Sequence, residues 1–258
     1  TKQAGVAYKR YAKCPKWDEF LLQICGGDTE TVDFLQRLFG YCLTGLTKEQ
    51  VFPIFWGKGA NGKSVLLRTV QAAMGDYAMT TPAESVLQKR NSGGATPELA
   101  RLHGARLAIA SEPNDGCVLA ETVVKQITGQ DTIVCRRLYG DLFEYVPQFK
   151  VILTTNHLPR ILGDDHGIWR RIMLVPFDQA FSGKKQKKNL IDELQAELPG
   201  ILRWLVEGVV AYLDEGLNPP ESVQQASQEY RSEMDIFGDW ITDCCVGKQG
   251  SVTAVSEL

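Results

Sequence analysis

Apolar residues recur at helical spacing near the start of the chain. One series stands at i, i+3, i+4 and i+7, and its members are Trp17, Phe20, Leu21 and Ile24. A second series of the same kind runs from Val32 to Cys42, after the capping candidates Asp28 and Thr29. Because apolar residues at this spacing share one face of an α-helix, the pattern predicts two amphipathic helices. We assign them to an N-terminal, collar-like helical segment over residues 1–46.

The middle of the chain carries short apolar runs of strand length, separated by helical stretches. The predicted strands are Val51–Trp56, Arg106–Glu112, Lys150–Asn156 and Arg171–Phe177. The predicted short helices between them cover Pro97–Gly104 and Thr122–Gly129. Near-continuous apolar strands that alternate with helices are typical of a parallel sheet covered on both faces. The sequence therefore predicts an α/β core over residues 47–182.

One stretch of this core has a different pattern. Residues Thr132–Pro147 form two strand-like arms around Tyr139-Gly140-Asp141, a sequence suited to a tight turn. We therefore expect a β-hairpin between the second predicted short helix and the strand that begins at Lys150.

The last part of the chain is again helical in pattern. Apolar residues continue at helical spacing from Leu190 to Val209, with an interruption at Pro199-Gly200, and another helix is predicted over Glu221–Cys245. The lysine-rich stretch GKKQKKN before them is interpreted as a solvated loop. These features define a C-terminal helical region over residues 183–246.

A glycine-rich stretch joins the first predicted strand to a helical pattern. Gly57–Ser64 has the sequence GKGANGKS, which fits the phosphate-binding loop G-x-x-x-x-G-K-S. In such a loop, backbone N–H groups and a helix N-terminus surround the phosphates. Lys63 is placed to reach the β- and γ-phosphates, and Ser64 to ligate Mg²⁺. The predicted nucleotide-binding positions are Gly57, Gly59, Ala60, Asn61, Gly62, Lys63, Ser64 and Val65.

Polar residues at two other strand ends are candidates to complete a hydrolytic site. Glu112 is a candidate for holding the metal and the attacking water, although Ser111 stands where an aspartate is common. Asn156 is a candidate for orienting water and sensing the γ-phosphate, while a strand-end Asn is also a common turn former.

Two adjacent arginines, Arg170 and Arg171, precede the last predicted strand. They fit an arginine finger that stabilises charge on a neighbouring subunit's nucleotide. They also fit a surface ion pair with Asp164 or Asp165, and these residues alone leave both interpretations open.

Composition narrows the class of protein. The net charge of −3 and pI near 5.7 argue mildly against a nucleic-acid partner, although one local basic element is enough to override them. No apolar run approaches the ~20 residues of a membrane span. The seven cysteines include no C-x-x-C pair and are accompanied by three histidines. We therefore expect reduced intracellular thiols rather than a zinc site or a disulfide framework.

Taken in order, four stretches resemble the consecutive motifs of a superfamily 3 helicase domain. They are GKGANGKS, ARLAIASE, KQITGQDTIVCRRLYGDLFEYVPQFKVILTTNHLP and DDHGIWRRIMLVPF. The chain is most similar to the C-terminal helicase of phage- and plasmid-type primase–helicases, relatives of the poxvirus primase–helicases. The resemblance runs from about Trp17 to the end. It implies an AAA+ P-loop NTPase core with a central parallel sheet, a small N-terminal helical domain and C-terminal helices.

The resemblance further implies an activity. Members of this family form hexameric rings that couple hydrolysis of ATP, with Mg²⁺, to 3′→5′ movement on single-stranded DNA. Lys63 and Ser64 take the Walker A roles, Glu112 the Walker B role and Asn156 the sensor 1 role. Arg170 becomes the arginine finger that acts on the next subunit.

Arg171 is then the neighbour and rival of that finger. Lys125, before Thr128-Gly129, matches a basic position that reaches the adjacent subunit's nucleotide. The hairpin matches one that projects into the ring channel and contacts DNA, through Arg136, Arg137 and Tyr139. The alternative interpretation is an ordinary exposed hairpin, and the order of the motifs favours DNA contact.

The resemblance also sets the expected partners and context. The expected partners are single-stranded or forked DNA, further copies of the chain, and a primase domain or replication proteins. The expected location is the cytoplasm of a bacterial host, away from membranes. Because the chain begins at Thr1 and residues 247–258 resemble the start of a truncated winged-helix domain, we expect a piece of a longer protein that makes no primers itself.

Two other function classes remain open on the sequence. The chain could be a non-helicase AAA+ ATPase that remodels or assembles a nucleoprotein or protein complex, and stimulation of ATPase activity by DNA would distinguish the two. A P-loop small-molecule kinase would need a phosphate acceptor, and it gives no reason for the hairpin or the arginine pair.

Overall fold

A five-stranded parallel sheet forms the centre of the protein. The computed structural model describes residues 1–88, 97–111, 115–183, 187 and 189–235. The strand order is β2-β3-β6-β1-β7, and every neighbouring pair is parallel. The strands are β1 (Phe52–Trp56), β2 (Ala78–Pro82), β3 (Leu107–Ser111), β6 (Lys150–Thr155) and β7 (Ile172–Pro176). The predicted α/β core with a parallel sheet is confirmed.

The strand β2 was not predicted from the sequence. It lies at one edge of the sheet, where it pairs only with β3 among the described strands. Of its residues AMTTP, only Ala78 and Thr81 are buried. An edge strand is half exposed, so it lacks the continuous apolar run by which the inner strands were identified.

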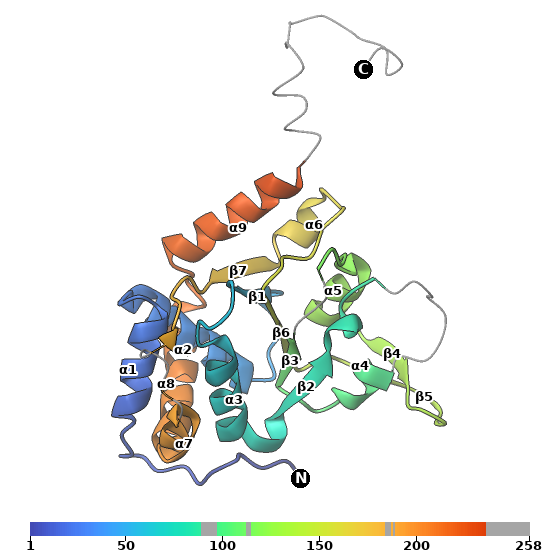
Figure 1. Ribbon diagram of the computed structural model, residues 1–258. Helices are drawn as coiled ribbons and strands as arrows, with labels where there is room; N and C mark the ends of the chain where they lie inside the picture. Colours follow the sequence, from blue (N-terminus) through green and yellow to red (C-terminus); the bar gives the residue numbers. More distant parts are fainter. Residues whose placement is uncertain (89–96, 112–114, 184–186, 188, 236–258) are drawn as a thin grey trace, which may run out of the picture.

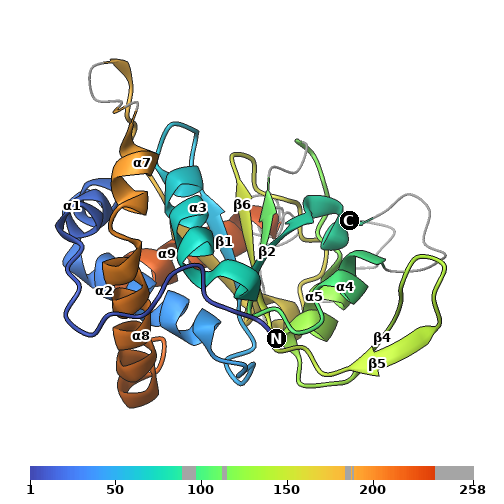
Figure 2. The same cartoon turned by 90° about the horizontal axis from the view of Figure 1, so that it is seen from below.

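Helices cover both faces of the sheet (Figures 1 and 2). The helices on one face are α1 (Pro15–Ile24), α2 (Thr29–Leu43), α3 (Lys63–Met74), α7 (Leu190–Gln195) and α8 (Leu198–Glu215). The opposite face is covered by α4 (Pro97–Arg101) and α5 (Glu121–Thr128). Because successive strand residues point to opposite faces, Phe55 of β1 belongs to the first core cluster and Ile54 to the second.

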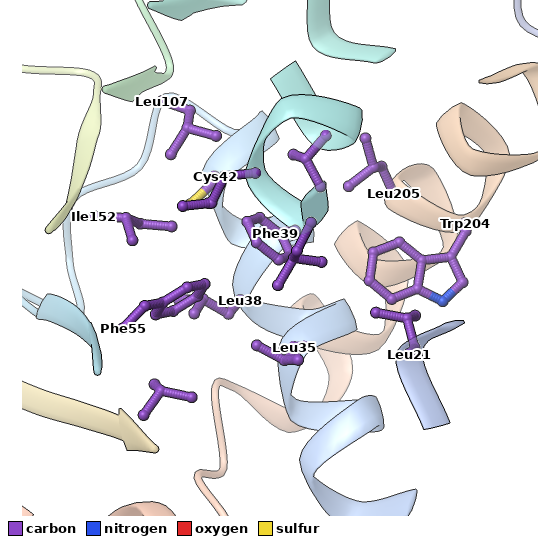
Figure 3. Close-up of a cluster of buried hydrophobic side chains, with 14 of the residues drawn as sticks. Leu21, Leu35, Leu38, Phe39, Cys42, Phe55, Leu107, Ile152, Trp204 and Leu205 are labelled. Carbon is purple, nitrogen blue, oxygen red and sulfur yellow. The ribbon is translucent and has the colours of Figure 1, made fainter. Parts of the chain in front are cut away.

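The N-terminal helices share one core with the sheet rather than packing by themselves. Phe39 of α2 makes edge-to-face contact with Phe55 of β1, with ring centroids 6.1 Å apart, and Trp204 of α8 lies in the same cluster (Figure 3). A Cβ atom on Gly40 would overlap the backbone of Gly208, so α2 and α8 cross at a glycine contact. The capping prediction at Asp28 is confirmed, since its side chain accepts from the N–H groups of Glu30 and Thr31.

The C-terminal helices differ from the prediction in two places. The break expected at Pro199-Gly200 lies three residues earlier, at Ala196-Glu197, because Pro199 falls in the first turn of α8, where a missing N–H costs nothing. The helix predicted over Glu221–Cys245 is α9 (Glu221–Met234), which runs beside the edge strand β7 (Figure 1). The Leu174 N–H on that edge donates to Ser227 Oγ at 2.9 Å. Residues 236–258, with the expected start of a winged helix, lie outside the described residues.

The remaining elements are short. They are the 3₁₀ turns η1 (Gly75–Tyr77) and η2 (Ala83–Ser85), the helix α6 (His166–Trp169), and the antiparallel strands β4 (Ile133–Arg136) and β5 (Leu142–Tyr145). The last two form the predicted hairpin. None of the helices in the described ranges is long and apolar enough to cross a membrane.

Candidate active site

The glycine-rich loop lies between β1 and α3, as the motif requires. It follows Trp56, and α3 begins at Lys63 with Gly62 as its N-cap in the left-handed region (φ 85°). Gly59 has φ 99°. A Cβ atom on Gly57 would overlap the Asn61 side chain and the Phe177 carbonyl. These glycines therefore meet conformational and steric demands that a larger residue could not.

Lys63 and Asn156 are brought together at the carboxyl edge of the sheet. The Lys63 side chain is only 4% exposed, and its Nζ donates to the Gly57 carbonyl at 2.7 Å and to Asn156 Oδ1 at 3.2 Å. Asn156 directly follows β6, the neighbour of β1, so the topology itself places the amide beside the lysine. A cation, an amide and the N-terminus of α3 thus face one small volume.

The metal-binding part of the prediction is only partly described. Ser64 is exposed in the first turn of α3, where its hydroxyl suits a hard cation such as Mg²⁺. Ser111 ends β3 and pairs with Thr154 of β6, and Glu112 lies outside the described residues. In the described part of the chain, no three His, Cys, Asp or Glu residues form a cluster that could hold a metal.

A cavity of about 570 Å³ opens beside the loop, and sequence reasoning missed the half of its walls that lies outside the loop. The residues that line it outside the loop are Phe20, Gln23, Phe181, Lys187, Leu190 and Ile191. They come from α1 and from the segment that leads into α7, so the cavity joins parts of the chain far apart in sequence. Its size and largely apolar walls suit a small organic ligand. The helical periodicity of α1 marked Phe20 as apolar, but nothing in the pattern separated a cavity wall from core.

The packing of α1 against the loop explains how this cavity is held. A Cβ atom on Gly62 would lie 2.5 Å from Ile24 Cγ2, so α1 contacts the loop directly. On the other side, the Phe181 N–H donates to the Ala60 carbonyl at 2.7 Å. Lys187 Nζ lies 3.7 Å from Glu19 Oε1, an exposed ion pair that bridges the two walls.

Arg170 and Arg171 lie at the opposite, amino edge of the sheet. The Phe52 N–H at the start of β1 donates to the Arg171 carbonyl at 2.6 Å. Since β1 has five residues, this edge is about 13 Å from the glycine loop along the strand. Neither arginine can therefore reach the phosphate site of its own chain, as expected of a residue that would act on another subunit.

The two arginines have different surroundings. Arg171 is 9% exposed, and its guanidinium donates to Thr128 Oγ1 at 3.0 Å and to the Gly167 carbonyl. Burial, and then the nearby charge of Arg170, lower the pKa of Arg171. Arg170 is exposed, and its Nη2 donates to Gln50 Oε1 at 2.5 Å. The geometry therefore favours Arg170 as the residue free to meet a partner.

Among the residues that the structure describes, neither arginine forms an ion pair with Asp164 or Asp165. Asp165 instead binds Lys125, with Nζ and Oδ2 2.6 Å apart, and its other oxygen accepts from the Ile168 N–H at the start of α6. The hydrogen bond from Lys125 lowers the pKa of Asp165. Lys125, which the resemblance assigns to the neighbouring nucleotide, is thus held by its own chain on the same face as Arg171.

The hairpin extends from the body of the protein on the side of α4 and α5 (Figure 2). Its inner face is buried through Ile133, Cys135 and Tyr145, and the Tyr145 hydroxyl donates to the Leu99 carbonyl at 2.6 Å. Tyr139 at the tip is 100% exposed with φ 58°, a strained conformation for a residue with a side chain. The tip therefore presents an aromatic ring to the outside.

The two arginines next to Tyr139 in sequence contact other parts of the hairpin. Arg136 Nε donates to the Gly140 carbonyl at 2.9 Å, and the Arg137 guanidinium lies 5.1 Å from the centre of the Phe143 ring. Both arginines remain exposed. Leu138, 68% exposed, adds an apolar side chain that sequence reasoning did not single out. Two cations and an aromatic ring thus lie together on a projecting element.

Comparison with known proteins finds similarity to putative helicases and to a primase of large DNA viruses. Residues 55–171 match a family of unknown function (DUF5906). The chain is 33% identical over 249 residues to the putative helicase L207/L206 of Acanthamoeba polyphaga mimivirus, which covers 90% of this chain and 26% of that protein. It is 28% identical over 163 residues to primase D5 of fowlpox virus (strain NVSL). The matched region covers 61% of this chain and 20% of that protein.

A solved structure has the same fold. The apo structure of the NrS-1 C-terminal region matches with a TM-score of 0.71 at 13% identity, over 94% of this chain and 57% of that one. The chain spans about a quarter of the length of the curated relatives it matches. The ordered motifs, the loop geometry and these matches agree, and the chain belongs to a primase–helicase-related family that includes the putative helicases and primase D5 of large DNA viruses.

Proposed function

We propose that the chain is the ATP-hydrolysing motor of a replicative DNA helicase. The observation that carries this proposal is the contact of Lys63 with Gly57 and Asn156 at the carboxyl edge of the sheet. When ATP binds, Lys63 exchanges these neutral acceptors for the β- and γ-phosphates. Asn156 is then within reach of the γ-phosphate and of the attacking water. Ser64 and Glu112, together with the phosphates, would hold Mg²⁺, which would supply positive charge to offset that of the transferred group.

The cavity beside the loop supports the nucleotide assignment. Its position next to the α3 N-terminus leaves the phosphates on the loop and the base between α1 and α7. Phe20 and Phe181 offer apolar surface to a ring, and Gln23 offers a side-chain amide.

A ring accounts for the position of the arginines. Arg170 lies at the edge opposite its own phosphate site, so it can act on a nucleotide only from a neighbouring subunit. A head-to-tail interface repeated around a closed ring brings each Arg170 to the next phosphate loop. The proposed assembly is a homo-oligomer, a hexamer as the resemblance implies.

The hairpin supplies the proposed contact with DNA. Arg136 and Arg137 give phosphate-binding charge, and Tyr139 gives a stacking surface for a base of a single strand. One basic element repeated around a ring is sufficient despite the acidic composition of the chain. The proposed substrates are single-stranded and forked DNA, with a primase domain or other replication proteins as partners. A phage or mobile-element source with a bacterial cytoplasm stays a prediction.

The test measures ATP hydrolysis with and without single-stranded DNA, and unwinding of a forked duplex. We expect ATPase activity that DNA stimulates, together with ATP-dependent unwinding, and Lys63→Ala should abolish both. ATPase activity that DNA does not change, in a chain confirmed as assembled, would contradict the helicase proposal and favour the remodelling ATPase. Near-normal hydrolysis by Lys63→Ala would contradict the phosphate-loop assignment itself.

A further inference from the structure

Gln50, in the loop before β1, contacts both arginines at the amino edge of the sheet. Its Oε1 accepts from Arg170 Nη2 at 2.5 Å and from Arg171 Nη2 at 3.3 Å. An amide oxygen has two acceptor sites, and here both are used by guanidinium groups. Since neither guanidinium can accept a hydrogen bond, only the oxygen of the amide can face them.

The backbone at Gln50 is in an unusual conformation. Its φ is 53°, in the left-handed region that residues with a side chain seldom adopt, and its N–H donates to the Thr47 carbonyl at 3.1 Å in a turn. A strained backbone persists only where its surroundings hold it. Among the described interactions of Gln50, the side-chain hydrogen bonds to the two arginines are those that a different residue would lose.

Gln50 links a buried arginine, Arg171, to an exposed one, Arg170. Arg171 is buried and held by Thr128 Oγ1 and the Gly167 carbonyl, so it cannot move readily. The Gln50 side chain is held in place by its hydrogen bond to Arg171. Its second hydrogen bond therefore holds the exposed Arg170 side chain in a defined place. The amide thereby limits the directions in which the Arg170 side chain extends.

The acceptor is neutral, although a carboxylate would bind two guanidinium groups more strongly. Nearby carboxylates are engaged elsewhere: Asp165 with Lys125, and Glu49 with the Tyr212 hydroxyl at 2.8 Å. Among the residues that the structure describes, no acid forms an ion pair with Arg170 or Arg171. Asp165 lies close enough to Arg171 to act on its charge, whereas Arg170 has no such described neighbour. The positive charge of Arg170 is therefore available to an external anion.

We propose that Gln50 is a positioning residue that directs Arg170 towards the polyphosphate of a neighbouring subunit's nucleotide while leaving the arginine charge uncompensated. This inference rests on the proposed role of Arg170 in trans. It gives a reason for an amide at this position, where a carboxylate of the same shape would hold Arg170 more tightly and cancel its charge.

Two substitutions separate this role from a structural one. Gln50→Glu keeps the shape and adds a charge, so it should leave the melting temperature unchanged or raise it, because its hydrogen bonds to the arginines are charge-assisted. Gln50→Asn suits the left-handed backbone better but is too short to bridge both arginines. We expect kcat for ATP to fall on the order of tenfold or more in both, with KM within about twofold, since their own phosphate loops are intact.

Mixing locates the defect. Gln50→Glu has an intact phosphate loop, and Lys63→Ala has an unaltered Arg170, so mixed rings should recover ATPase activity above either variant alone. If Gln50→Glu had the wild-type kcat while Arg170→Ala was inactive, the positioning role of Gln50 would be overturned, and the role of Arg170 would stand. Loss in Gln50→Glu without recovery on mixing would place the defect in its own site and also overturn it. A fully active Arg170→Ala would instead overturn the trans arginine on which the inference rests.

Discussion

Asn156 is the residue whose two substitutions test the phosphate site most directly. Asn156→Ala removes an amide near the γ-phosphate, so we expect kcat for ATP to fall on the order of a hundredfold with little change in ATP affinity. Asn156→Asp places a carboxylate 3.2 Å from the Lys63 ammonium, at the position of the present acceptor, and this charge would also repel the phosphates. ATP affinity should therefore fall in Asn156→Asp but not in Asn156→Ala.

The measurements are steady-state ATPase kinetics and equilibrium binding of a fluorescent ATP analogue, with melting temperature as the control for folding. If Asn156→Asp bound ATP as tightly as the wild type, Asn156 would not face the phosphates.

Lys150 is a buried cation, and its contribution to the free energy of unfolding can be measured from its dependence on pH. It is 4% exposed, donates to the carbonyls of Thr44, Leu46 and Gln148, and lies 4.7 Å from the centre of the Tyr41 ring. Burial lowers the pKa of Lys150 from 10.5 to about 8. Between these values the unfolded chain binds more protons than the folded one, so the Lys150 contribution to the free energy of unfolding rises with pH.

The prediction compares the wild type with Lys150→Met, since other groups titrate in the same range. Well below pH 8, at about pH 6.5 and lower, Lys150 is protonated in both the folded and the unfolded chain, so the difference in unfolding free energy between the two proteins should be constant. From pH 8 to 9.5 it should change in favour of the wild type by on the order of 1–2 kcal/mol. Urea unfolding at several pH values measures it, with Lys150→Gln as the second variant. A flat difference across this range would mean that Lys150 titrates near its ordinary pKa.

At the scale of elements, the sequence predicts those helices, strands and loops that have a periodic apolar pattern or a motif of fixed spacing. The inner strands and α1, α2 and α3 follow from apolar patterns, because each buries one face or both. The loop at Gly57 and the strand-end position of Asn156 follow from the same logic. The exposed edge strand β2 has no such pattern, and the register that joins Lys63 to Asn156 depends on which strands are neighbours in space.

The site residues that were not predicted from the sequence were missed for one common reason. Phe181 and Leu190 line the cavity because a segment 120 or so residues from the loop returns to it, and the Phe181 N–H binds the Ala60 carbonyl. Gln50 is polar and stands in a loop, so its residue type carries no signal. Contacts between distant segments are fixed by tertiary packing, and a single sequence shows only that each segment has an apolar or polar face.

The hairpin is the element that decides between a helicase and a remodelling ATPase. Arg137→Ala with Tyr139→Ala removes a cation and an exposed ring from the tip, and base stacking on such a ring is worth about 1–3 kcal/mol. Basal ATPase activity should survive, while single-strand binding, stimulation by DNA and unwinding all fall. The binding that remains should also depend less steeply on salt, since fewer counterions are released.

The N-terminal part of the chain offers a matched control. Arg10 lies over the ring of Tyr11, with the guanidinium 5.6 Å from the ring centre, and Tyr11 is 80% exposed. Arg10→Ala with Tyr11→Ala therefore removes the same two residue types away from the hairpin and should leave DNA binding unchanged. A hairpin variant that unwinds a forked duplex at the wild-type rate would exclude the hairpin from the mechanism.

At the scale of the whole molecule, the two edges of the sheet that carry the candidate residues are the reason for proposing an assembly of several copies. The phosphate loop follows the carboxyl end of β1, and Arg170 precedes the amino end of β7, with the core between them. α1, α2, α3 and α8 share that core, so no hinge within it could bring the two edges together. Under the proposed function, a complete site therefore takes two subunits, one that supplies the loop and one that supplies the arginine.

Mixing two inactive variants tests this arrangement. Arg170→Ala should bind ATP with wild-type affinity but fail to hydrolyse it, because every loop in its ring lacks an opposing cation, and Lys63→Ala should fail because its loops are defective. In an equal mixture, roughly a quarter of the interfaces combine an Arg170→Ala loop with a Lys63→Ala arginine. Those interfaces are intact, so ATPase activity should reappear and reach its maximum near equal proportions. Arg231→Ala, an exposed substitution on α9, is the control: mixed with Lys63→Ala, its activity should only decline as Lys63→Ala is added. If rings form at every ratio and the first mixture never recovers, Arg170 does not act across the interface.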